Sequence, residues 1–550
     1  MKFYNKIKVC IILAAMLSIS GCSKFLDIYN PSAVTADYYD TKIGQEKLVV
    51  DLYQQYRTVF NTGALQFYGT DMYMAVDESP TSAEFNGYSK DLSGLSPVIG
   101  DYWSVLYKII QESNILINRC TPEITGTSYE PLMAQGRFLR ALAYYYLVES
   151  FGPVPLLLKE NTKTADLITS VTRESEEKIY DFLISEIDSI KDKLPAVATE
   201  SGRLSNTAVL HFLGKLYLTR SYRSYAKADD LANAITNFEA VIGSGHYRLL
   251  SRFDDVFNQE NQNNAEVIWA IQYGTDKNYI GSGNPETYQF GFNIVALYPG
   301  MFSMNQQDYP AMQRGYWTNP IVHQWFRHPE LDTRYAVTFK REFIINDISN
   351  ADYGKVGIYM PLWNDVSNDT KGAKYYYPFL NSGGSYNWYP ALGAMNWRTD
   401  IMPMCQKFKD TKIVWGAPAS REDVIFRMAD TYFLCAEAYL KQGKPDKALA
   451  KVNAILNRAA GSESNYNVMK IASTSDLTLD RLLEEKGCEM FGEHDRWFDL
   501  KRTNTLLTRA ILNPLVVHYN NISATNLVRP IPYDETIKVT GLTQNPGYNN

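Results

Sequence analysis

The chain contains few cysteines and histidines, and neither residue type forms a metal-binding or disulfide pattern. Six of each are spread over 550 residues. No two cysteines have metal-ligand spacing, and no two histidines lie four residues apart on a predicted helix. Six cysteines are too few for a disulfide framework in a chain of this size. We therefore predict no metal site, and we expect Cys120, Cys405, Cys435 and Cys488 to be ordinary thiols in or near the core.

Clustered positive charge is also missing. The sequence has 54 Lys and Arg residues against 60 Asp and Glu, a formal net charge of −6, and its basic residues are scattered without a basic run. An acidic chain without a basic arm has no general electrostatic attraction for nucleic acid or anionic lipid. We expect no nucleic-acid partner.

Long apolar runs are absent outside the N-terminal leader. A basic stretch over residues 1–8 precedes a short apolar run over residues 9–17, a combination typical of a secretory signal and too short for a permanent membrane span. The next residues, Ser18 to Cys22, resemble a bacterial lipobox, which implies that the mature chain begins at an acylated Cys22. The alternative is a plain signal peptide with a chance cysteine. We predict a lipoprotein signal peptide over 1–21 and a lipidated tether over 22–40.

Aromatic residues are abundant, in contrast. They make up 13% of the chain and include 40 Tyr and 9 Trp. Tyrosine suits wet surfaces because it presents an apolar ring together with a hydroxyl. A protein that handles a polar ligand through ring faces fits this composition.

Helical periodicity covers two parts of the chain, separated by a different kind of sequence. Arg421 to Gln442, the turn Gly443-Lys444-Pro445 and Asp446 to Ala460 read as a helix pair with small residues at close-packing positions, similar to a tetratricopeptide unit. The predicted helices before residue 250 are 45–60, 102–118, 131–151, 173–194, 205–220 and 231–242, with Ser205 as an N-cap. We predict a mainly α fold with tetratricopeptide-like helical repeats over about 41–250 and 421–503.

Between about residues 251 and 420, helical periodicity fades and Gly, Asn, Tyr and Trp become dense. We expect a large irregular, loop-rich insertion with short strands, such as Glu266 to Tyr273 and Thr338 to Ile345, and functional residues concentrate in such loops. The C-terminal end, 504–550, is predicted to be extended. Residues 41–550 would then form a single body.

Several sequence blocks, taken in order, resemble one family. The first is the helix from Gln135 to Tyr146 that ends in Phe151-Gly152-Pro153-Val154-Pro155. The later blocks are Arg173–Ser175 with Ile179-Tyr180, Gly202–Ser205 before Ala208–Leu218, Ala436–Tyr439, Glu484–Glu493, Arg496–Arg502, Pro530–Pro532 and Gln544–Tyr548. This ordered set is similar to SusD/RagB proteins. A departure is Gly487, where the family often has Arg.

The resemblance implies a function as well as a fold. Such a protein would be a lipid-anchored nutrient-binding protein on the outer membrane, facing the exterior. It would capture an oligosaccharide or polysaccharide, sometimes a peptide, and deliver it to a SusC-like TonB-dependent transporter that it covers as a lid. The resemblance carries over no catalytic residues and no cofactor besides the lipid.

Aromatic residues of the loops are the predicted ligand contacts, because rings bind the C–H faces of sugars while polar side chains bind the hydroxyls. The predicted rings are Tyr316, Trp317, Trp363, Tyr386, Trp388, Tyr389 and Trp397, with Phe85 and Tyr88 from the loop Asp77 to Tyr88. The alternative for each ring is burial in the core. Trp388 and Tyr389 are favoured because they follow a Gly-Gly pair.

Three acidic groups have a catalytic or metal-binding alternative. Glu484, Glu485 and Glu489 could be the paired carboxylates of a glycosidase, but at helical spacing beside basic residues a solvated or salt-bridged face is favoured. Glu493-His494-Asp495 lacks the surrounding residues of a catalytic triad or a zinc site. Trp497, between Arg496 and Asp499, is expected in the core.

The stretch Asp365 to Asp369 could supply oxygens to Ca²⁺ but lacks the EF-hand spacing, so we favour a polar loop. We predict that the chain is not an enzyme. The rival functions are a lipid-anchored glycoside hydrolase and a repeat scaffold that binds only protein.

Overall fold

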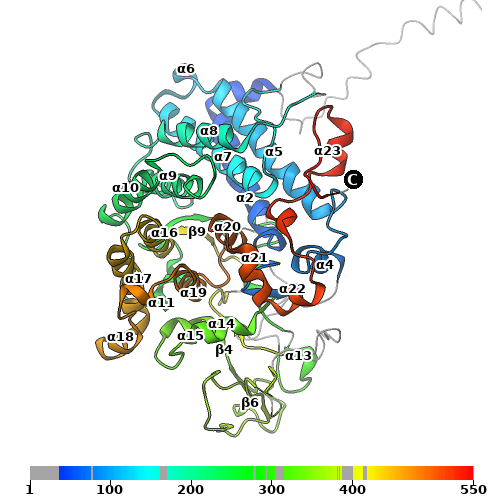
Figure 1. Ribbon diagram of the computed structural model, residues 1–550, viewed down its shortest axis with the longest axis vertical. Helices are drawn as coiled ribbons and strands as arrows, with labels where there is room; N and C mark the ends of the chain where they lie inside the picture. Colours follow the sequence, from blue (N-terminus) through cyan, green and yellow to red (C-terminus); the bar gives the residue numbers. More distant parts are fainter. Residues whose placement is uncertain are drawn as a thin grey trace, which may run out of the picture.

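The computed structural model describes residues 36–75, 79–161, 170–274, 276, 280–292, 294–303, 315–380, 382, 384–386, 401–412 and 418–548. Helices dominate, and the strands in these residues are short (Figure 1). The predicted mainly helical fold is confirmed. In Figure 1 the first helical block lies above the second, and the sheet that contains β6 lies at the lower end.

The first helical block contains the six helices that the periodicity predicts. They are α2 (Lys42–Asn61), α5 (Pro97–Arg119), α7 (Tyr129–Phe151), α8 (Glu176–Asp188), α9 (Asn206–Arg220) and α10 (Asp230–Gly243). Ser205 is confirmed as the N-cap of α9, since its hydroxyl accepts a hydrogen bond from the Ala208 N–H at 3.2 Å. Gly152, with φ of +71°, ends α7 in a conformation that favours glycine.

The second block follows the insertion. It contains β9 (Asp423–Arg427), α16 (Met428–Lys441), α17 (Pro445–Ala460), α18 (Glu463–Met469), α19 (Leu479–Glu489) and α20 (Arg496–Arg502). The expected helix start at Arg421 is wrong, because residues 423–427 pair antiparallel with β2 (Val267–Ile271). Phe238 of α10 and Ala436 of α16 share one hydrophobic cluster, so the two blocks stack on each other.

The insertion contains short strands, as predicted, and also short helices that were not predicted. β1 (Tyr73–Ala75) pairs with β3 (Tyr316–Thr318), and β4 (Phe339–Lys340) pairs with β8 (Met404–Cys405). β5 (Glu342–Ile344), β6 (Val356–Tyr359) and β7 (Tyr375–Tyr376) form a three-stranded sheet. The insertion also contains α11 (Phe253–Val256), η5 (Gln259–Asn261), α12 (Glu286–Gln289), α13 (Ile294–Leu297), α14 (Pro320–Trp325) and α15 (Thr333–Thr338).

Two other expectations differ from the structure. The segment expected as a loop over 77–88 contains α4 (Pro80–Asn86), whose N-cap Ser79 accepts a hydrogen bond from the Ser82 N–H at 3.3 Å. The end of the chain is not extended throughout, because it contains α21 (Leu506–Arg509), η7 (Ala510–Leu512), α22 (Pro514–Tyr519), η8 (Ala524–Leu527) and α23 (Tyr533–Lys538). The remaining short helices are η2 (Ala36–Asp40), α3 (Ala64–Phe67), α6 (Pro122–Thr125), η3 (Gly126–Ser128) and η6 (Thr474–Asp476).

Candidate functional site

Four of the predicted ligand-contacting rings lie in the hydrophobic core. Tyr316 and Trp317 sit on β3 and are 6% and 1% exposed, because β3 is paired with β1. Phe85 is 4% exposed, and Tyr88 is 5% exposed with its hydroxyl donating to the Gly69 carbonyl at 2.8 Å. In this structure all four rings pack against other side chains.

Two other predicted rings are half-buried at the edge of the insertion. The Trp363 indole N–H donates to the Phe326 carbonyl at 3.0 Å, and the Tyr386 ring packs edge-on against Phe379 at 5.2 Å. Trp388, Tyr389, Trp397 and the lipidation residue Cys22 lie outside the described residues.

A group of tyrosines that was not predicted from the sequence reaches the surface of the three-stranded sheet. We call Tyr298, Tyr375 and Tyr377 the tyrosine cluster. The Tyr298 and Tyr375 rings lie 4.9 Å apart, and the Tyr298 and Tyr377 hydroxyls share a hydrogen bond at 2.8 Å. Tyr375 is 37% exposed, and the other two are half-buried. Rings held in place by neighbours at the surface can bind a sugar face without losing side-chain entropy on binding.

The sequence signal for this cluster is the run Tyr375-Tyr376-Tyr377. Side chains alternate along a strand, so Tyr375 and Tyr377 share a face while Tyr376 points to the other, toward the Tyr359 ring at 6.1 Å. Burial, followed by the hydrogen bond with Tyr377, raises the pKa of Tyr298. The Tyr298 hydroxyl therefore stays protonated and can both donate and accept hydrogen bonds.

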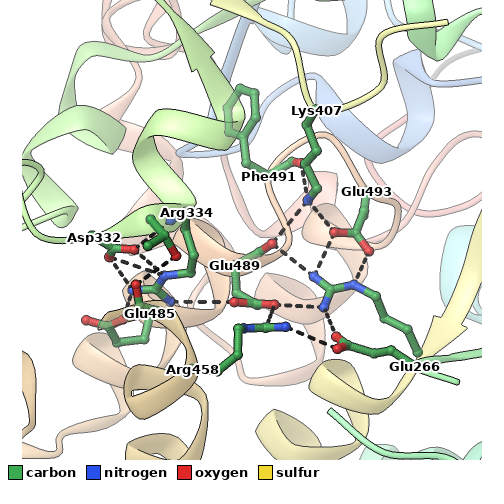
Figure 2. Close-up of polar contacts among 12 residues, drawn as sticks. Glu266, Asp332, Arg334, Lys407, Arg458, Glu485, Glu489, Phe491 and Glu493 are labelled. Carbon is green, nitrogen blue, oxygen red and sulfur yellow. Dashed lines mark hydrogen bonds and ion pairs between the residues drawn. The ribbon is translucent and has the colours of Figure 1, made fainter. Parts of the chain in front are cut away.

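A buried network of charged side chains lies where the insertion meets β9 and α19. Arg427 contacts Glu266 at 2.9 Å, Glu489 at 2.7 Å and Glu493 at 2.6 Å. Figure 2 shows Arg458 reaching both Glu266 and Glu489. The side chains of Arg427, Glu266 and Glu489 are 0% exposed, so each charge depends on its partners for solvation.

Residues of the insertion complete this network. Arg334 of α15 contacts Asp332 at 2.7 Å and Glu485 of α19 at 2.9 Å. Lys407 donates to the carbonyls of Glu489 at 3.1 Å and Phe491 at 2.9 Å and pairs with Glu493 (Figure 2). The network thus joins the insertion to α19 through charge-assisted hydrogen bonds.

The glutamates considered as catalytic carboxylates are all ion-paired. Glu484 contacts Arg327 at 2.8 Å, and Glu485 contacts Arg481 at 2.6 Å in addition to Arg334. Glu489 lies in the buried network. The salt-bridged interpretation is confirmed, because an arginine neutralises each of the three carboxylates.

The motif around Trp497 is structural, as predicted. Trp497 is 2% exposed, and Arg496 contacts Asp71 at 2.7 Å. Asp499 contacts Lys486 and Arg502, both at 2.7 Å.

His494 lies in a buried cluster with two carboxylates. Its Nε2 is 2.7 Å from Asp423 and 3.5 Å from Glu286, and the three ligand atoms are within 4.8 Å of one another, the spacing of a metal-binding group. Burial alone would lower the pKa of His494, but Asp423 and then Glu286 outweigh it and raise the pKa to about 9. A protonated imidazole donates a hydrogen bond to Asp423, so its positive charge offsets the negative charge of that carboxylate.

Comparison with known protein families shows to which family this chain belongs. The model of the SusD family matches residues 265–548, and the model described as "Starch-binding associating with outer membrane" matches residues 24–218. The chain belongs to the SusD family. Proteins of the SusD family are non-catalytic, so the prediction that the chain is not an enzyme is confirmed.

Individual relatives are similar over most of their length. A SusD-like protein of Bacteroides ovatus is 24% identical over 95% of this chain and 86% of its own. The starch-binding protein SusD of Bacteroides thetaiotaomicron is 26% identical over 76% of this chain and 72% of its own. The structure of a laminarin-binding SusD-like protein superposes with a TM-score of 0.67 at 20% identity, covering 92% of this chain and 100% of that protein.

The helices carry no sign of a membrane span. Across the residues that the structure describes, every helix is too short or too polar to cross a lipid bilayer.

Proposed function

We propose that this SusD-family protein is a cell-surface glycan-binding lipoprotein. It captures an oligosaccharide or polysaccharide outside the cell and passes it to a SusC-like TonB-dependent transporter. The tyrosine cluster on the insertion carries the proposal, together with the starch- and laminarin-binding relatives of the same family. Trp363 and Tyr386 belong to the same loop-rich insertion and extend the proposed surface. Trp388, Tyr389 and Trp397 stay predicted ligand contacts from the sequence.

The geometry of the cluster suits a neutral sugar. Exposed ring faces contact the C–H face of a pyranose, while the phenol hydroxyls of Tyr298 and Tyr377 bind its hydroxyl groups. We propose an outer-membrane location with the body facing outward, held by the lipid on Cys22. The family model named for outer-membrane association supports this location.

Calorimetric titration with neutral oligosaccharides tests the proposal. We would use full-length protein in a sugar-free detergent and titrate maltoheptaose and laminarihexaose. Tyr375→Ala and Tyr298→Ala should each weaken binding about tenfold, since a contact between a sugar and an aromatic ring contributes roughly 1–2 kcal/mol. Tyr222→Ala, which removes a half-buried tyrosine of the helical body, serves as the matched control. Equal affinity of all three variants and the parent would refute the role of the cluster.

The transporter partnership needs a separate measurement. Co-purification of the protein with a TonB-dependent transporter from the same outer membrane supports delivery. If the transporter and this protein migrate separately after mild solubilisation, the protein captures glycan without handing it to that transporter.

A further inference from the structure

A pocket lies in the helical body, between α5 and the C-terminal helix α23. Both helices lie in the upper half of Figure 1, away from the β6 sheet. Its volume is about 570 Å³, within the range of small-molecule sites. Its lining comes from α5, residues 155–161, Val171 and residues 535–542, which are far apart in sequence.

Two aromatic rings line one wall of this pocket and are fixed by their neighbours. The Trp103 and Tyr107 rings lie 4.9 Å apart, and the Trp103 ring packs edge-on against Phe151 at 5.0 Å. The Tyr107 hydroxyl donates to the Pro155 carbonyl at 2.8 Å, which fixes the orientation of the half-buried ring. The wall is therefore preorganised for a flat apolar face.

Polar groups lie around this wall. Ser104 and Gln111 are three and four residues from Tyr107, so they share its side of α5. The half-buried Glu535 of α23 also lines the pocket. Among the described residues, neither the Ser104 hydroxyl nor the Glu535 carboxylate has a hydrogen-bond partner or an ion pair. These groups are available to a ligand with several hydroxyls.

We propose that the pocket between α5 and α23 is a second saccharide-binding site, specific for a neutral sugar unit. The proposal rests on the glycan-binding function above. A bound lipid chain would cover the Ser104 hydroxyl and the Glu535 carboxylate without forming hydrogen bonds to them, which costs binding free energy. A charged ligand would gain little electrostatic binding energy, because the two charged residues of the lining, Lys108 and Glu535, have opposite signs. A sugar ring stacked on Tyr107 would place its hydroxyls toward Ser104, Gln111 and Glu535.

Hydrogen–deuterium exchange with and without saturating maltoheptaose or laminarihexaose tests this proposal on the full-length protein. We expect added protection over residues 103–111 and 535–542. Ser104→Trp fills the pocket and should abolish that protection, whereas Asp101→Trp places the same bulk at an exposed position of α5 outside the pocket and should preserve it. Glu535→Gln, which keeps the shape, should weaken the second binding event about tenfold.

The outcomes separate this inference from the proposed function. Protection confined to residues 294–303 and 375–377 overturns the second site and leaves the tyrosine cluster intact. Protection at 103–111 alone supports the second site and counts against the cluster. Protection at 103–111 that survives both Ser104→Trp and Glu535→Gln overturns the assignment of these residues, and a lack of protection at both places contradicts both proposals.

Discussion

At the residue scale, the buried network balances charge within the core. Burial alone would raise the pKa of Glu489, but Arg458, Arg427 and Arg334 outweigh burial and lower it to about 2. A buried pair adds little net stability compared with an apolar pair, yet removing one partner leaves an uncompensated charge. The network therefore makes the fold intolerant of single changes.

Arg427→Met tests this intolerance. The substitution leaves Glu266, Glu489 and Glu493 buried without their shared cation, so we expect a loss of about 3–5 kcal/mol in the free energy of unfolding, measured by urea denaturation. Arg252→Met is the control, because it removes an ion pair that is largely exposed and should leave the urea midpoint unchanged. Equal midpoints for both variants would contradict a structural role for the network.

His494 predicts a pH dependence of stability. Its folded-state pKa of about 9 lies above the ordinary value of 6.5, so its contribution is fully present below pH 6.5 and is lost as the pH rises through about 9. The free energy of unfolding of the parent should therefore fall between pH 6.5 and 9, and this fall should be smaller in His494→Gln. Parallel pH profiles for the two proteins would show that His494 is not the group that titrates.

At the element scale, local sequence patterns predicted the long helices well, and helices such as α5 and α17 carry an apolar face of helical period. The errors arose where tertiary contacts decide. Residues 423–427 look continuous with the following helix, yet they pair with β2 about 150 residues away in sequence.

The aromatic residues of the candidate site show the same limit. Tyr316 and Trp317 are buried because β3 pairs with β1, which lies some 240 residues earlier in the sequence, and no local pattern reveals that pairing. The tyrosine cluster could be suspected from the run Tyr375-Tyr376-Tyr377, but its third ring comes from Tyr298, at the end of α13. The placement of the site in the insertion stays a prediction from the sequence, and local patterns could not show which of its rings reach the surface.

The packing of α14 on α19 depends on Gly487. A Cβ at Gly487 would lie 2.7 Å from Cζ3 of the Trp325 ring, which is too close. Gly487→Ala should therefore destabilise the protein by about 1–3 kcal/mol in spite of alanine's higher helix propensity. Gly243→Ala, at the end of α10 with open space around the added Cβ, is the control and should be neutral or stabilising by about 0.5 kcal/mol. Thermal denaturation of both variants checks this; similar destabilisation of the two would exclude the Trp325 contact as the cause.

At the scale of the whole molecule, the helical blocks form a frame and the insertion presents the proposed binding surface. The buried network ties these two parts together, so the surface is held on a rigid support. The family models match residues 24–218 and 265–548, which include both helical blocks and most of the insertion.

The proposed membrane attachment concerns the whole chain and would depend on one residue, Cys22. Cys22→Ala should move the protein from the membrane fraction to the soluble fraction without changing its melting temperature, because the body has its own core. Fractionation of cells expressing each form measures this. Unchanged membrane association of the variant would refute lipid anchoring at Cys22.

The most direct test of the binding function is the fate of the glycan. Full-length protein is incubated with maltoheptaose and laminarihexaose, bound sugar is separated from free sugar, and its chain length is determined by mass spectrometry. We predict that at least one oligosaccharide is retained and recovered at its original length. Recovery of shortened sugar, or retention of neither, would contradict a non-catalytic glycan-binding function.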